Sequence, residues 1–156
     1  MREFENQHLA NTAKSFAKAR SAGHQAPDLF EAIAQEAQGR VGQFSALDLK
    51  DMALAFARAG HKAPALFEAI AQQSQRRVGQ FGKHHLIDTA WAFALTGHEA
   101  PALFEAIAQE AQGRVGQFKL HDVSNLATSF ATAGKKAPGL FEALGLGLGL
   151  GLERPV

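Results

Sequence analysis

The chain has 156 residues, of which 46% are hydrophobic, 12 are Phe and none is Cys or Tyr, and its formal net charge is +1. Without cysteine, disulfide scaffolds, thiolate metal sites and cysteine nucleophiles are excluded, and the apolar content is too high for an intrinsically disordered chain. A net charge this small does not by itself predict a nucleic-acid partner. The sequence has no run of 18 apolar residues, so we expect no membrane-spanning helix.

One segment recurs at a spacing of 37 residues. APDLFEAIAQEAQGRVGQF begins at Ala26, APALFEAIAQQSQRRVGQF at Ala63 and APALFEAIAQEAQGRVGQF at Ala100, and a shorter copy, APGLFEA, begins at Ala137. A fixed period of this size is typical of stacked repeats, which present an extended surface instead of a central pocket. We expect a helical-repeat domain over residues 1–144 and a Gly-Leu tail over residues 145–156. The repeat units are residues 4–43, 44–80, 81–117 and 118–144.

The first helix of the second unit is predicted over Ala46–Ala59. Its apolar residues recur at helical spacing and are Leu49, Met52, Ala53, Phe56 and Ala57. Ser45 and Asp48 have the spacing of a capping box at its start. Gly60 is expected to end the helix, because Gly adopts the left-handed conformation without steric cost.

Pro64 is predicted to begin the second helix, since the first helical position needs no N–H donor. The buried stripe of this helix is predicted to be Leu66, Phe67, Ile70, Ala71, Ser74 and Val78, with Gly79 ending it. The same place is held in the other units by Pro27, Pro101 and Pro138. Short turns between the two helices predict antiparallel hairpins. The expected fold is therefore all-α, an α-solenoid of four stacked antiparallel helix hairpins.

The first helix varies between units, whereas the second is nearly constant. Ala26–Phe44 and Ala100–Phe118 match at 18 of 19 positions, but Phe44–Lys62 and Phe81–Glu99 match at only 9 of 19. Three variable columns are spaced by four residues, so they lie on one helix face. They are Ala10, Lys50, Ile87 and Ser124; Lys14, Leu54, Trp91 and Thr128; and Lys18, Arg58, Leu95 and Thr132. An adjacent column is always Asn or Asp: Asn11, Asp51, Asp88 and Asn125.

We expect these columns to stand side by side on an open face, as a modular recognition surface. A further column of small residues would let neighbouring first helices pack closely, and it consists of Ser15, Ala55, Ala92 and Ser129. The alternative interpretation is neutral drift on a solvated face, because most surface substitutions are nearly neutral.

The strings LIDTAWAFALTGHEAPALFEAIA and LANTAKSFAKA resemble the octotricopeptide repeats and the related 37-residue heptatricopeptide repeats. These are helical-hairpin repeats of organellar proteins. The resemblance implies binding of single-stranded RNA at roughly one base per repeat. It also implies a role in RNA processing, stability or translation, and a chloroplast or mitochondrial location. The Trp that such repeats carry in the first helix occurs here only as Trp91.

Together, the columns and the resemblance give a set of candidate RNA-binding residues. They are Asn11, Lys14, Lys18, Lys50, Asp51, Leu54, Arg58, Ile87, Asp88, Trp91, Ser124, Asn125 and Thr128. The basic members are candidates for phosphate contacts, with ordinary solvated charges as the alternative. Arg40, Arg77 and Arg114 are instead predicted to be structural, because cations complement a helix C-terminus.

The sequence does not predict catalysis, a cofactor or a metal. His24, His61 and His98 follow the Gly that ends each first helix, which favours a role in the turn. His84, His85 and His121 lack further ligands for a metal. No nucleophile–base set is recognisable, and GLGLGLGLGL lacks the Lys of a phosphate-binding loop.

Two functions remain open at this point. The first is binding of single-stranded RNA through the first helices. The alternative is a protein–protein scaffold of the same architecture, in which Leu54, Ile87, Trp91 and Leu95 form an apolar groove. We also expect self-association through the C-terminal end, where the Gly-Leu tail leaves the last hairpin without a polar cap.

Overall fold

In a computed structural model of the protein, which describes residues 2–20, 22–23 and 25–147, all regular secondary structure is helical. The α-helices of these ranges are α1 (Arg2–Arg20), α2 (Pro27–Gln38), α3 (Ala46–Ala59), α4 (Pro64–Arg77), α5 (Lys83–Thr96), α6 (Pro101–Gln112), α7 (Leu120–Thr132) and α8 (Pro138–Gly147). Short 3-10 helices follow α2, α4 and α6 and are η1 (Val41–Gln43), η2 (Val78–Gln80) and η3 (Val115–Gln117). Within this described part, no helix combines the length and the apolar character that a bilayer crossing requires.

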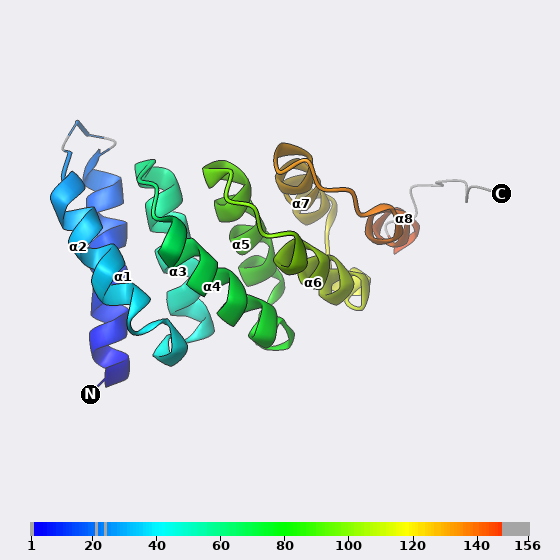
Figure 1. The fold of residues 1–156 in the computed structure, drawn as a ribbon. Coiled ribbons are helices and arrows are strands. Elements are labelled where there is room, and N and C mark those ends of the chain that lie inside the picture. Colours follow the sequence, from blue (N-terminus) through cyan, green and yellow to red (C-terminus); the bar gives the residue numbers. More distant parts are fainter. Residues whose placement is uncertain (1, 21, 24, 148–156) are drawn as a thin grey trace.

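The helices form two layers (Figure 1). Odd-numbered helices lie in one layer and even-numbered helices in the other, and the two helices of each hairpin pack against each other. The most extensive contacts join successive odd helices, α1 with α3, α3 with α5 and α5 with α7. Successive even helices also touch. The result is a solenoid-like row in which each hairpin contacts the hairpins beside it, as the sequence period predicts.

The local signals in the sequence explain the helix ends. The predicted bounds Ala46–Ala59 are those of α3, and the Ser45 side chain and Asp48 form the predicted capping box. Gly60 ends α3 in the left-handed conformation, with φ 64°, and Pro64 begins α4 as expected.

The end of the second helix differs from the prediction. Val78 was expected in the buried stripe of that helix, but α4 ends at Arg77 and Val78 is half-buried in η2. The N–H of Phe81 donates to the carbonyl of Val78 at 3.0 Å, which closes a tighter turn before the next unit begins.

The core lies between the two layers and is continuous along the row. Large side chains from both layers are fully buried in it, among them Leu49, Phe56, Phe67, Ile70 and Phe93. Each such side chain contributes about 1.5–3 kcal/mol when removed from water. At the C-terminal end, α8 extends through Gly147 into the range assigned to the Gly-Leu tail, and residues 148–156 lie outside the described part of the chain.

Candidate nucleic-acid interface

The odd helices pack closely because small residues lie between them. Ala53 and Ala90 are completely buried, and so are Ala55, Ala92 and Ser129 of the predicted small column. Ser15, in the same column, is exposed, because no helix lies against the outer side of α1 in the described structure. This packing confirms the predicted alignment of the odd helices and fixes which columns can reach solvent.

The Asn/Asp column joins neighbouring odd helices by ion pairs. Lys14 Nζ of α1 lies 2.9 Å from Asp51 Oδ2 of α3. Lys50 Nζ lies 3.1 Å from Asp51 Oδ1 and 3.8 Å from Asp88 Oδ2 of α5. Asp51 is therefore buried between cations, contrary to the expected open position. Two of the predicted phosphate-binding lysines thus already have carboxylate partners.

A basic depression lies on the layer of odd helices. We use this name for the pocket of about 690 Å³ lined by Lys14, Ser15, Ala17, Lys18, Ala55, Arg58 and Leu95. Lys18 and Arg58 are exposed and make no ion pair within the described ranges. Three cations and no carboxylate line this pocket, so it favours an anionic ligand. It has the size of a small-molecule site.

A second, smaller pocket lies between α5 and α7. We call it the tryptophan pocket; its volume is about 230 Å³ and it is lined by Ile87, Asp88, Trp91, Asn125, Thr128 and Ser129. Trp91 is half-buried there, and the Asn125 amide nitrogen lies 3.2 Å from His121 Nε2. The Trp91 indole can stack on a flat ring, and the exposed side chains of Asn125 and Thr128 can hydrogen-bond to the edge of that ring.

Several predicted residues do not reach solvent. Leu54 and Ile87 are only 5% and 6% exposed, because their columns face the next odd helix and apolar side chains there pack into that contact. Ala10 is buried for the same reason. The apolar groove predicted from Leu54, Ile87, Trp91 and Leu95 is therefore wrong. Leu95 belongs to the basic depression, whereas Trp91 lies in the tryptophan pocket.

Three other predicted residues are accessible for a reason that does not apply to every repeat unit. Asn11 lies on the outer side of α1, and Ser124 and Thr128 lie on α7. All three are exposed where the row of described odd helices ends. Their exposure therefore reflects the end of the row and not a column that faces solvent in every unit.

Two of the three arginines predicted to be structural, Arg77 at the end of α4 and Arg114 after α6, bind main-chain carbonyl groups, whereas Arg40 pairs with the side chains of Glu5 and Glu36. Arg77 Nη1 donates to the carbonyl of Phe44, and Arg114 Nη1 donates to the carbonyl of Phe81. Arg114 Nη2 also donates to the carbonyl of Gly79 at 3.1 Å. Arg77 and Arg114 therefore hold the carbonyl group at the start of their own hairpin.

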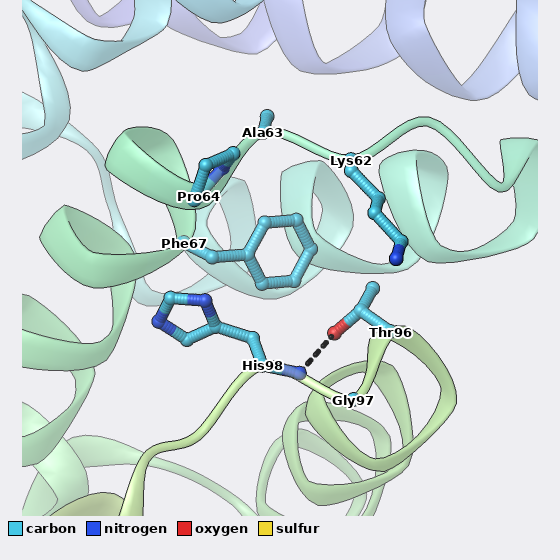
Figure 2. A pocket seen from close by; sticks show the side chains of 7 residues that line it. All are labelled: Lys62, Ala63, Pro64, Phe67, Thr96, Gly97 and His98. Carbon is cyan, nitrogen blue, oxygen red and sulfur yellow. Dashed lines mark hydrogen bonds between the residues drawn. The ribbon is translucent and has the colours of Figure 1, made fainter.

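The turn histidines pack between hairpins. His98 lies against Phe67 and Phe93, with ring centroids 6.0 and 5.9 Å away, and its Nε2 is 3.4 Å from Glu68 Oε2. His61 repeats this arrangement in the preceding hairpin. Figure 2 shows His98 beside Phe67 in a pocket of about 220 Å³ between two turns. The structure confirms the turn role of both residues, and His24 lies outside the described part.

The other histidines do not gather into a metal-binding group. His84 and His121 are exposed, and His85 is half-buried. Burial lowers the pKa of His85, and the nearby Lys50 charge lowers it further. Over the described ranges, no three His, Cys, Asp or Glu side chains are close enough together to hold a metal ion.

Comparison with known proteins adds one finding. A family model described as RNA-editing substrate-binding complex 6 protein (RESC6) matches residues 1–147. No curated protein matches the chain.

Proposed function

The chain belongs to the RESC6 family, and from that premise we propose that it binds single-stranded RNA through the layer of odd helices. The observation that carries this proposal is the basic depression, where Lys18 and Arg58 make no ion pair within the described ranges and lie beside Lys14, whose one carboxylate partner is Asp51. Phosphates of a single strand would lie against these cations. The description of the family supports an RNA-related role within an editing complex.

The tryptophan pocket would supply the contact to a base. A strand that leaves the basic depression along the layer of odd helices reaches α5 and α7, which carry Trp91 and Asn125. Base–aromatic stacking tolerates any base and contributes about 1–3 kcal/mol. We propose that the four hairpins act as octotricopeptide-like repeats over residues 1–144 and that the protein acts by binding, not by catalysis.

The test is fluorescence anisotropy with a labelled, randomised single-stranded RNA at two salt concentrations. Lys18→Glu combined with Arg58→Glu should weaken binding by about tenfold or more and reduce the salt slope by about 1.4, since each phosphate contact contributes about 0.7. The matched control is Arg76→Glu combined with Lys136→Glu, which makes the same charge change at exposed residues outside both pockets. Equal losses in both double variants, or no binding by the wild type, would contradict the proposal.

A second candidate function is assembly with other proteins. The observation that favours it is the exposure of Phe16 and Leu120, which are 39% and 62% exposed at opposite ends of the row. Large apolar side chains on an open face are typical of protein contacts.

A further inference from the structure

Consecutive hairpins meet through the same aromatic contact three times. Each contact pairs a Phe from the first turn of an even helix with a Phe of the next odd helix, in an edge-to-face arrangement. The pairs are Phe30–Phe56, Phe67–Phe93 and Phe104–Phe130, with ring centroids 5.2, 5.1 and 5.2 Å apart. Such pairs contribute about 0.5–1.5 kcal/mol beyond the area that they bury.

The outer side of α1 carries the odd-helix Phe of this pair, but no even helix of the described structure lies there to supply the other Phe. Phe16 occupies the place of Phe56, Phe93 and Phe130, which are buried, but it is 39% exposed. Thr12 and Ser15 are also exposed, although their equivalents in α3, α5 and α7 are buried. No helix of the described structure lies before α1 to cover this face. We call it the α1 face.

The opposite end of the row has the complementary half. Phe141 of α8 occupies the place of Phe30, Phe67 and Phe104, but it is only half-buried and contacts Phe130 of its own hairpin. Ala131 of α7 is exposed, whereas its equivalents Ala17, Ala57 and Ala94 are buried. Leu120 is 62% exposed, whereas its equivalents are buried (Asn6) or half-buried (Ala46 and Lys83). We call this side of α7 and α8 the α7/α8 face.

We propose that the α7/α8 face of one copy of this chain docks on the α1 face of a second copy, head to tail. A second copy of this chain is the occupant we propose, because each of the two faces carries the half of the repeated Phe contact that the other face lacks. The junction would bring Phe141 of one copy to Phe16 of the next, repeating the internal Phe pairs. This inference does not depend on RNA binding.

The polar residues at the two faces fit this docking. Between α1 and α3, the residue of the Asn/Asp column is Asp51, and its carboxylate pairs with Lys14 of the neighbouring helix. At the proposed junction the corresponding residues are Asn11 of one copy and Thr128 of the other, both uncharged and exposed. Burial of this pair leaves no unpaired charge, which would be costly at an interface.

Head-to-tail docking is a heterologous contact, which extends into open chains unless its geometry closes a ring. The full-length protein should therefore form a series of oligomers that grows with concentration. Sedimentation velocity from about 1 to about 300 µM, a range that reveals micromolar dissociation constants, measures this directly. A wild-type protein that stays monomeric over this range would overturn the proposal.

Two single variants each block one face. Phe16→Glu blocks the α1 face and Leu120→Glu blocks the α7/α8 face, so each variant alone should be monomeric. A mixture of the two should form a dimer and nothing larger, because one open face of each kind remains. Leu47→Glu is the matched control, since Leu47 is 42% exposed away from both faces, and it should assemble like the wild type.

Thr12→Arg and Ala131→Arg are a second pair at exposed positions of the same two faces, should a Glu variant lose its helical circular dichroism. Oligomers of either blocked variant alone, or a mixture that stays monomeric, would contradict head-to-tail docking.

Discussion

Lys14 Nζ of α1 lies 2.9 Å from Asp51 Oδ2 of α3, and Lys50 Nζ lies 3.1 Å from the other oxygen of the same carboxylate. One buried carboxylate therefore connects two helices and also neutralises cations on the layer proposed to bind RNA. The Lys14 side chain remains 46% exposed, so it can exchange this partner for a phosphate.

Asp51→Asn should strengthen RNA binding severalfold at low salt, because it releases Lys14 for a phosphate contact. It should also lower the free energy of unfolding by about 1 kcal/mol, the upper range for a pair with an exposed partner. Anisotropy titration and urea denaturation measure the two effects. Asp28→Asn makes the same charge change at an exposed residue outside both pockets. An equal gain in that variant would show a general charge effect instead.

Trp91 is a built-in reporter, because the chain has one Trp and no Tyr. Stacking of a base on the indole should quench its fluorescence as single-stranded RNA is added. Trp91→Ala should weaken binding by about 5- to 150-fold, which corresponds to about 1–3 kcal/mol of stacking, and Trp91→Phe should retain most of the affinity. Fluorescence that stays constant while anisotropy reports binding would place the RNA away from the tryptophan pocket.

Phe16 and Phe56 hold the same place in consecutive units but differ in burial. Phe56→Ala should lower the free energy of unfolding by about 3–5 kcal/mol, because it leaves a cavity beside Phe30. Phe16→Ala should cost less than about 1 kcal/mol, as at an ordinary surface site. Urea denaturation at low protein concentration, where self-association is absent, separates the two. Similar losses would mean that the α1 face is covered in solution.

The pair formed by Lys83 and Asp122 should make stability depend on acid pH. Burial by itself raises the pKa of Asp122, but hydrogen bonds from Lys83 Nζ and the main-chain N–H of Lys119 outweigh it and hold this pKa below its usual value. A lowered pKa stabilises the fold above the unfolded value of about 3.9, and this contribution is lost as the pH falls through the folded value.

Urea denaturation at pH 6 and at pH 3 tests this linkage. The wild type should lose stability between the two values, and Asp122→Asn should lose less. Asp28→Asn, which leaves the Lys83–Asp122 pair intact, should fall as steeply as the wild type. A fall in Asp122→Asn as steep as that of the wild type would refute the linkage.

The helices could be predicted from sequence because their signals are local. The capping box of Ser45 and Asp48, the left-handed Gly60 and the first-turn Pro64 each act within one turn of the chain, and all three appear in the structure. The 37-residue period likewise predicts that equivalent helices stand side by side. Such signals do not depend on how far one hairpin is rotated against the next.

The candidate site was harder to predict because exposure depends on that rotation. Leu54 and Lys14 share a column, yet Leu54 is buried in the contact with the next helix while Lys14 extends beyond it. Asp51 is buried because Lys14 of α1 and Lys50 of α3 both lie against its carboxylate. The spacing of residues within one helix does not show a contact of this kind between helices. Phe16 shows the opposite effect, since a core-type residue is exposed where no helix of the described structure lies against the outer side of α1.

Ultraviolet cross-linking of the full-length protein to the randomised single-stranded RNA, with mass-spectrometric mapping of the adducts, tests the central proposal most directly. We expect adducts on peptides from α1, α3 and α5, with Trp91 and residues around Lys18 and Arg58 among them. Adducts confined to the even helices, or none at a concentration that saturates anisotropy, would contradict binding through the layer of odd helices.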